Sequence, residues 1–111
     1  MRPEDRTPIL HMIDAAEAIA DFLASRTRSD IDSDRMLMFA LVRAVEVFGE
    51  AAGKVSPETQ RAIAVVPWPQ VVAMRNRLIH AYFDVNRTIL WKTVTEEIPA
   101  LLPALRQLVR Q

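Results

Sequence analysis

The sequence from residue 34 to residue 52 reads DRMLMFALVRAVEVFGEAA, and its apolar residues recur at steps of three and four. This spacing is typical of an α-helix. The apolar residues cover more than half of the helix circumference and are Met36, Leu37, Ala40, Leu41, Ala44, Val45, Val47, Phe48 and Ala51. The pattern predicts a helix from about Asp34 to Ala52 that is buried by two sets of neighbours, which can include a second copy of the chain. Within it, Arg43 and Glu46 are three residues apart and are expected to pair, and Gly53 is expected to end the helix.

The segment before this helix has a single apolar stripe. Its members are Ile9, Met12, Ile13, Ala16, Ile19, Ala20 and Leu23. The stripe predicts a first helix from Thr7 or Pro8 to about Arg28, with Thr7 as N-cap and Pro8 at the first helical position. Residues 29–33, SDIDS, are expected to form a loop that supplies the N-cap of the second helix.

The segment after Gly53 predicts two more helices. Ser56 followed by Pro57 and an acidic residue is typical of a helix start, and the prolines of residues 67–69, PWP, end that short helix. A fourth helix is expected to follow, with Val71, Val72, Met74, Leu78 and Ile79 among its residues. Asp84-Val85-Asn86 is the next expected turn.

A last helix is expected from about Arg87 to Arg110, kinked or split in two at Pro99 and Pro103. With only two glycines and little strict alternation of polar and apolar residues, the chain is predicted to be all-α. The expected architecture is a four- to five-helix antiparallel bundle, with residues 1–111 forming a single domain.

Composition narrows the possible functions. Half of the 111 residues are apolar and a quarter are charged, which is typical of a soluble globular protein. Because the chain has no cysteine, disulfides and thiolate metal sites are excluded, and we expect a cytoplasmic protein. The two histidines, His11 and His80, are too far apart in sequence to suggest a metal-binding motif, and we expect neither metal nor cofactor. No apolar run reaches the ~20 residues of a membrane-spanning helix, and the N-terminal residues do not resemble a signal peptide. The net charge of zero disfavours non-specific binding to nucleic acid, although twelve of the fourteen basic residues are arginines, which suit local phosphate contacts.

Chemically capable side chains cluster at residues 75–82, RNRLIHAY, where an arginine, a carboxamide, an imidazole and a phenol occur together. On an ideal helix, which turns by about 100° per residue, Asn76 and His80 lie about 40° apart and Arg75 and His80 about 140° apart. Arg75 and His80 would then not share one stripe. A cleft formed with another surface is the more natural geometry.

From these residues alone, a structural interpretation of the cluster is favoured. His80 is then a partly buried histidine with a hydrogen-bonded ring, and Arg75 and Arg77 are solvated charges. Tyr82 is a core residue with its hydroxyl at the rim, and the two tryptophans are packing anchors. Only Asn76, which is mildly unfavourable inside a helix unless its amide is used, tilts the balance towards a site.

The chain resembles the HEPN domains and, within them, the HepT-like toxins. The family signature is an arginine, then usually an asparagine, with a histidine a few positions later, and Arg75-Asn76 followed by His80 matches it. The narrower His-x-Tyr form matches His80-Ala81-Tyr82. The likeness covers most of the chain from about Asp34 to Pro103, through Gly49-Glu50-Ala51-Ala52, Ser56-Pro57-Glu58, Pro67-Trp68, Met74, Leu78-Ile79 and Trp91.

The resemblance implies a metal-independent ribonuclease from a toxin–antitoxin pair. It implies a homodimer in which motif residues of two protomers line one cleft, with Arg75 and His80 as catalytic residues and Asn76 in support. Arg77 is a candidate contact to an RNA phosphate. The implied partner is an MntA-like nucleotidyltransferase antitoxin that silences the toxin by adenylylating Tyr82.

Two alternatives remain open. The domain can bind RNA or nucleotide without cutting and act through its complex with the nucleotidyltransferase. It can also be a helical adaptor that dimerises through the broad apolar face of residues 34–52.

Overall fold

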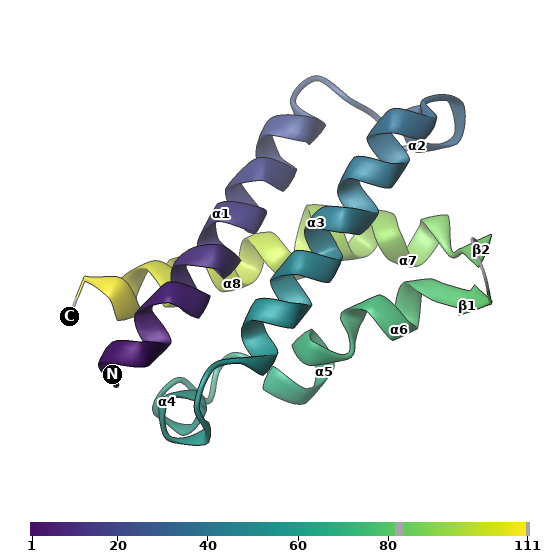
Figure 1. Ribbon diagram of the computed structural model, residues 1–111. Coiled ribbons are helices and arrows are strands. Elements are labelled where there is room, and N and C mark those ends of the chain that lie inside the picture. The colour runs from purple at the N-terminus through teal and green to yellow at the C-terminus, as the bar shows by residue number, and fades with distance from the viewer. Residues whose placement is uncertain (82–83, 111) are drawn as a thin grey trace.

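Helices form almost all of the structure (Figure 1). The computed structural model describes residues 1–81 and 84–110. A 3₁₀ turn at Pro3–Asp5 precedes the first α-helix, and a π-helical turn at Thr93–Glu97 joins the last two. The other elements, in chain order, are α1 (Arg6–Leu23), α2 (Asp30–Ser33), α3 (Arg35–Gly53), α4 (Pro57–Ala62), α5 (Trp68–Val72), α6 (Met74–Leu78), β1 (Ile79–Ala81), β2 (Asp84–Val85), α7 (Arg87–Lys92) and α8 (Ile98–Val109). The all-α fold class is confirmed, with β1 and β2 forming one short antiparallel pair.

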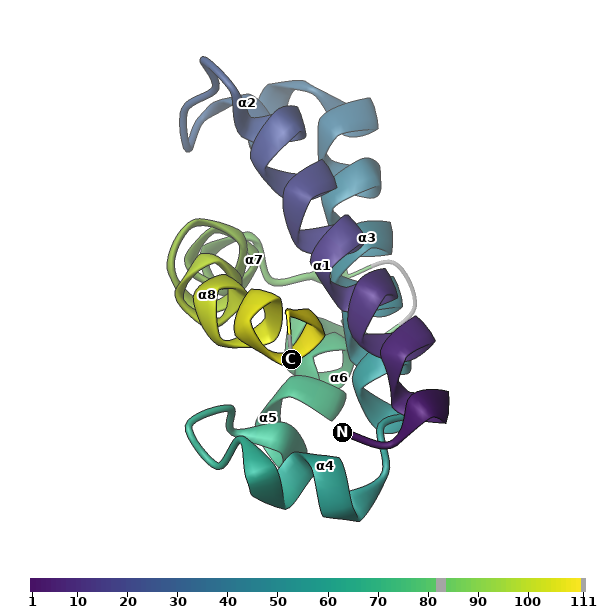
Figure 2. The ribbon, with the colours of Figure 1, turned by 90° about the vertical axis from the view of Figure 1, so that its left-hand side faces the viewer.

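Two layers of helices enclose the core (Figure 2). α1 and α3 lie side by side in one layer, while α5–α6 and α7–α8 form the other and are joined by the β1–β2 hairpin (Figure 1). The side chains between the layers that are at most 1% exposed include Ile9, Met12, Ile19, Leu41, Val45, Phe48, Val71, Leu78, Leu90, Ile98 and Leu105. Within the described residues, none of the helices combines the length and the apolar character that a membrane crossing requires.

The wide apolar face of α3 contacts two sets of neighbours, as predicted, with α1 on one side and α5 and α6 on the other, although Met36 of the predicted face is 83% exposed. Its N-cap is Asp34, which follows the predicted loop and accepts a hydrogen bond from the backbone N–H of Leu37 at 3.1 Å. This bond and the neighbouring Arg26 guanidinium lower the pKa of Asp34. The predicted loop at residues 29–33 instead contains the single-turn helix α2. Gly53 ends α3, as predicted.

The first helix differs from the prediction at both ends. It begins at Arg6, one or two residues early, because the preceding 3₁₀ turn leads directly into it and Thr7 is already helical. It ends at Leu23 rather than near Arg28. Ser25 has a φ of 61°, a left-handed conformation that breaks a right-handed helix. Arg26 closes the turn by donating its backbone N–H to the carbonyl of Leu23 at 2.9 Å.

The short helix predicted after Ser56 is confirmed, with Ser56 as N-cap of α4, but the continuous fourth helix is wrong. The helix is interrupted at Ala73 and ends at Leu78, where the carbonyl accepts a hydrogen bond from the backbone N–H of Asn86 at 2.7 Å. Ile79 then pairs with Val85 across the hairpin. The hydrogen bond from Asn86 to Leu78 thus takes the place of the bond that would continue the helix. The expected turn at residues 84–86 is accordingly part of β2, followed by Asn86, whose side chain caps α7 by accepting from Ile89 at 2.9 Å.

The last helix is split in two near Pro99, as predicted, by the π-helical turn that ends at Glu97, but it does not end at Pro103. Proline has no backbone N–H, so the carbonyl one turn earlier loses its helical donor and the helix widens there. Pro103 lies inside α8.

Candidate active site

The predicted site residues are distributed over two elements. Arg75, Asn76 and Arg77 lie in α6, and His80 lies in β1. Because the helix ends at Leu78, the helical angles expected between His80 and the other two residues do not apply. Only the backbone of His80 belongs to the described part of the structure, and Tyr82 lies outside the described residues.

Arg75 is held by a carboxylate from another helix. Its Nε donates a hydrogen bond to Oε2 of Glu46 on α3 at 3.0 Å. The side chain of Arg75 is 53% exposed, whereas that of Glu46 is 22% exposed. The expected pairing of Arg43 with Glu46 is therefore wrong: Arg43 pairs with Glu50 at 3.5 Å, because Glu46 faces α6. Nothing in the local sequence indicates the contact between Glu46 and Arg75, since its partners are 29 residues apart.

Asn76 is exposed on the surface of α6. Its backbone N–H donates to the carbonyl of Ala73 at 3.0 Å and closes the turn that opens α6. Among the described residues, no hydrogen-bond partner engages its side-chain amide. The amide is therefore accessible to a ligand.

Arg77 joins α6 to the last helical segment. Its Nη1 and Nη2 donate to the two carboxylate oxygens of Glu97 at 3.3 and 3.4 Å. Thr93 lies beside the same carboxylate and shares its one hydroxyl hydrogen between the carbonyl of Ile89 at 2.8 Å and Oε1 of Glu97 at 3.1 Å. Glu97 and Thr93 both lie in the π-helical turn, so this turn anchors α6 in addition to α3. A contact between Arg77 and an RNA phosphate stays a prediction, and such a phosphate would compete with Glu97.

A glycine on α3 allows the segment that leads into α6 to approach closely. A Cβ at Gly49 would lie 3.2 Å from the carbonyl oxygen of Val71. Any other residue would therefore require the backbone at Val71 to shift by a few tenths of an ångström. Gly49, the Arg75–Glu46 pair and the Arg77–Glu97 pair together fix the place of α6.

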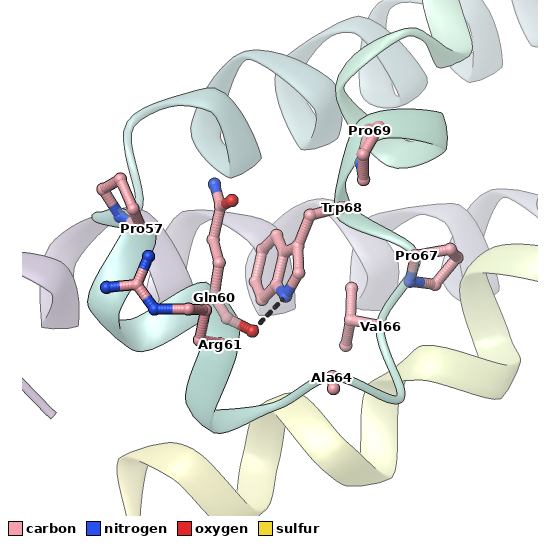
Figure 3. Close-up of a pocket in the computed structure, with 8 residues that line it drawn as sticks. All are labelled: Pro57, Gln60, Arg61, Ala64, Val66, Pro67, Trp68 and Pro69. Atoms are coloured by element: carbon pink, nitrogen blue, oxygen red, sulfur yellow. Dashed lines mark hydrogen bonds between the residues drawn. The ribbon is translucent and has the colours of Figure 1, made fainter.

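A surface pocket of about 380 Å³ lies elsewhere, between α4 and the start of α5 (Figure 3). Its wall includes Trp68, which is 5% exposed and donates its indole N–H to the carbonyls of Gln60 at 2.9 Å and Ile63 at 3.1 Å. Both bonds tie α5 to the end of α4, so Trp68 acts as a packing anchor. None of the residues that line this pocket comes from the 75–82 motif.

Comparison with known proteins assigns the chain to a family. The family model "Ribonuclease HepT-like" matches residues 12–108. The chain is 40% identical over 88 residues to "Probable ribonuclease HepT" of Thermococcus cleftensis, a match that covers 79% of this chain and 80% of that protein. It is 32% identical over 101 residues to "Putative RNase TTE0752" of Caldanaerobacter subterraneus subsp. tengcongensis, with 91% of this chain and 90% of that protein covered. No solved structure gives a significant match. The match over nearly the whole chain, with the arginine, asparagine and histidine of the motif in place, shows that the chain belongs to the HepT-like ribonucleases of the HEPN class.

Proposed function

We propose that this chain is a metal-independent RNA endonuclease, a single HEPN domain that acts as the toxin of a toxin–antitoxin pair in the cytoplasm. The observation that carries the proposal is the arrangement of α6 and β1. An exposed, carboxylate-held Arg75 and an exposed Asn76 lie in α6, and His80 follows directly in β1. The family relationship supports ribonuclease chemistry for this arrangement.

The proposed reaction needs only proton transfer and charge stabilisation from the protein, because RNA carries its own nucleophile in the 2′-hydroxyl. An imidazole is the side chain best suited to proton transfer near neutral pH, so His80 takes the 2′ proton or protonates the leaving 5′ oxygen. Arg75 stabilises the charge that develops on the phosphate through two N–H groups. Asn76 orients His80 or holds a phosphate oxygen. The products are a 2′,3′-cyclic phosphate and a 5′-hydroxyl end.

The reaction is tested by incubating purified protein with RNA in excess EDTA. We expect strand cleavage with 2′,3′-cyclic phosphate ends, and loss of cleavage in His80→Ala. A requirement for added metal, or cleavage that survives His80→Ala, would contradict the mechanism. RNA binding without scission by the wild type would instead favour a non-catalytic partner of the nucleotidyltransferase.

We propose that the active cleft is formed by a homodimer. Half-exposed apolar side chains occur on α3 and α5, the helices next to the Arg75–Glu46 pair. Val72, three residues before Arg75, is 45% exposed, and Phe39, two turns from Glu46 on the same face of α3, is 49% exposed. A second copy of the chain that covers these side chains would bring its own motif residues to the same cleft. With one motif histidine per chain, separate acid and base roles require one histidine from each protomer.

We further propose that an MntA-like nucleotidyltransferase silences the enzyme by adenylylating Tyr82. A bulky, negatively charged adenylyl group two residues from His80 would block the cleft and repel phosphate. The test is the intact mass of the protein after co-expression with the nucleotidyltransferase encoded beside it. We expect added adenylyl groups on the wild type and none on Tyr82→Phe. Equal modification of the two proteins would exclude Tyr82 as the acceptor.

A further inference from the structure

The contact between Glu46 and Arg75 joins two helices at the proposed active site. Glu46 lies on the long helix α3, where its side chain is 22% exposed, and Arg75 lies on the five-residue helix α6. A helix this short has little stability of its own, so the direction of a side chain on it depends on outside contacts. The carboxylate of Glu46, fixed on a well-packed helix, is such a contact.

The nitrogen of Arg75 that Glu46 engages determines which guanidinium donors stay available to a substrate. Glu46 accepts its hydrogen bond from Nε of Arg75, the nitrogen nearest the chain. No other described residue engages the guanidinium, so its two terminal nitrogens have no partner there. Two parallel N–H groups of this kind are what a phosphate oxygen pair accepts. Glu46 therefore orients the guanidinium without occupying the donors that a phosphate needs.

A second ion pair on the same helix provides a comparison. Arg43 and Glu50 are 3.5 Å apart, and their side chains are 64% and 58% exposed. Water screens such a pair strongly, and because both partners lie on one exposed helix surface, the pair does not hold two elements together. The Arg75–Glu46 pair is shorter, has a less exposed carboxylate and connects two helices. Glu50 is thus a matched control for Glu46.

We infer that Glu46 is a positioning residue, which holds Arg75 in the orientation that stabilises the transition state. This inference rests on the proposed ribonuclease function. Glu46 does not touch the RNA and acts only through Arg75. It differs in this from the motif residues, which act on the substrate directly.

The experiment is a double-mutant cycle on RNA cleavage. Glu46→Ala is expected to lower kcat about 10- to 100-fold, as loss of an orienting partner does, with a smaller change in KM. Glu46→Gln, whose amide oxygen can still accept from Nε, is expected to fall between the wild type and Glu46→Ala. In an Arg75→Lys background, which keeps the charge but lacks Nε, the same Glu46→Ala change is expected to have little further effect. Glu50→Ala is expected to stay close to wild type.

The possible results separate the inference from the function on which it rests. If the wild type cleaves RNA and Glu46→Ala cleaves equally well, the inference is overturned and the proposed function stands. A loss that is equally large in the Arg75→Lys background would also overturn it, because Glu46 would then act independently of Arg75. If the wild type does not cleave RNA, the proposed function itself fails, and the catalytic role of Glu46 fails with it. Thermal unfolding of each variant shows whether a loss of activity reflects unfolding.

Discussion

At the residue scale, Asp5 is the most deeply buried acidic residue in the described part of the chain. It is 1% exposed and accepts hydrogen bonds from the backbone N–H of Ser56 at 2.8 Å, the hydroxyl of Ser56 at 2.6 Å and the hydroxyl of Thr59 at 2.5 Å. Burial alone would raise the pKa of Asp5, but these hydrogen bonds outweigh it and lower the pKa below its ordinary 3.8. The carboxylate therefore fastens the N-terminal turn to the start of α4 in its ionised form.

A lowered pKa makes the stability that Asp5 contributes depend on pH. The contribution is fully present above the ordinary pKa of 3.8 and is lost as the pH falls through the lower pKa of the folded state. We expect Asp5→Asn to reduce the free energy of unfolding at pH 7 by about 1–3 kcal/mol, because charge-assisted hydrogen bonds are lost. We also expect this difference to shrink in acid. Urea unfolding between pH 7 and pH 2 checks both effects, with the exposed Glu4→Gln as control.

The chemistry assigned to Arg75 depends on its planar fork of donors. Lysine keeps the positive charge but offers a single ammonium group and no Nε for Glu46. We expect Arg75→Lys to lower kcat about 10²- to 10³-fold, which is the usual cost of removing a transition-state donor. Arg43→Lys, on the exposed surface of α3, serves as control. Single-turnover cleavage rates give the measurement, and near-normal activity of Arg75→Lys would show that charge alone suffices.

The residues that touch substrate in the proposed site could be predicted from a local motif, whereas the residue that positions one of them could not. Arg75, Asn76 and His80 occur within one short stretch, so resemblance to a family signature can identify them, although the residues by themselves favour a structural interpretation. Glu46 is joined to Arg75 only by the folding of α3 against α6. The sequence instead favoured Arg43 as its partner, because residues three apart on one helix are near neighbours.

At the element scale, the two glycines of α3 have different roles. A Cβ at Gly49 would lie 3.2 Å from the carbonyl oxygen of Val71, which the backbone N–H of Ala73 already engages. A Cβ at Gly53 would meet only a side-chain methyl of Val72 at 3.8 Å, an ordinary contact. Gly49 is therefore required for the close packing of α5 on α3, and Gly53 is not.

This difference predicts opposite effects of alanine at the two positions. Gly53→Ala should stabilise the protein by up to about 1 kcal/mol, since alanine favours the helix and reduces the freedom of the unfolded chain. Gly49→Ala should be destabilising in spite of the same helix preference, because α5 must move. It should also lower RNA cleavage, since α5 leads into the helix that carries Arg75. Equal thermal stability of the two variants would contradict this account of α5.

Local signals predicted some elements and missed others for one physical reason. The cap of α4 is set by a side chain next to the helix, so the sequence indicates Ser56 correctly, whereas the cap of α3 is Asp34, one residue beyond the loop that was expected to supply it. The end of α6 depends on a hydrogen bond between Leu78 and Asn86, and the pairing of Ile79 with Val85 depends on the same return of the chain. Apolar periodicity continues through Ile79, and it therefore favoured a helix where the folded chain forms a strand.

At the scale of the whole molecule, the proposed cleft requires a motif histidine from each of two chains. We expect a heterodimer of one wild-type and one His80→Ala protomer, isolated with two different affinity tags, to lose nearly all activity. Light scattering establishes that the preparation is a dimer. If each protomer worked alone, the heterodimer would retain about half of the wild-type rate. Such a result would assign a complete site to each chain.

The attachment of α6 by two ion pairs makes the enzyme sensitive to dissolved electrolytes. Arg75–Glu46 holds this helix on one side and Arg77–Glu97 on the other, and all four side chains are at least one-fifth exposed. Mobile ions at physiological concentration screen exposed charges beyond roughly 8 Å and weaken such pairs. The same ions weaken contacts to RNA phosphates. Potassium chloride should therefore reduce turnover of bound RNA as well as its binding, so that ionic strength sets the working rate of the enzyme at two separate steps.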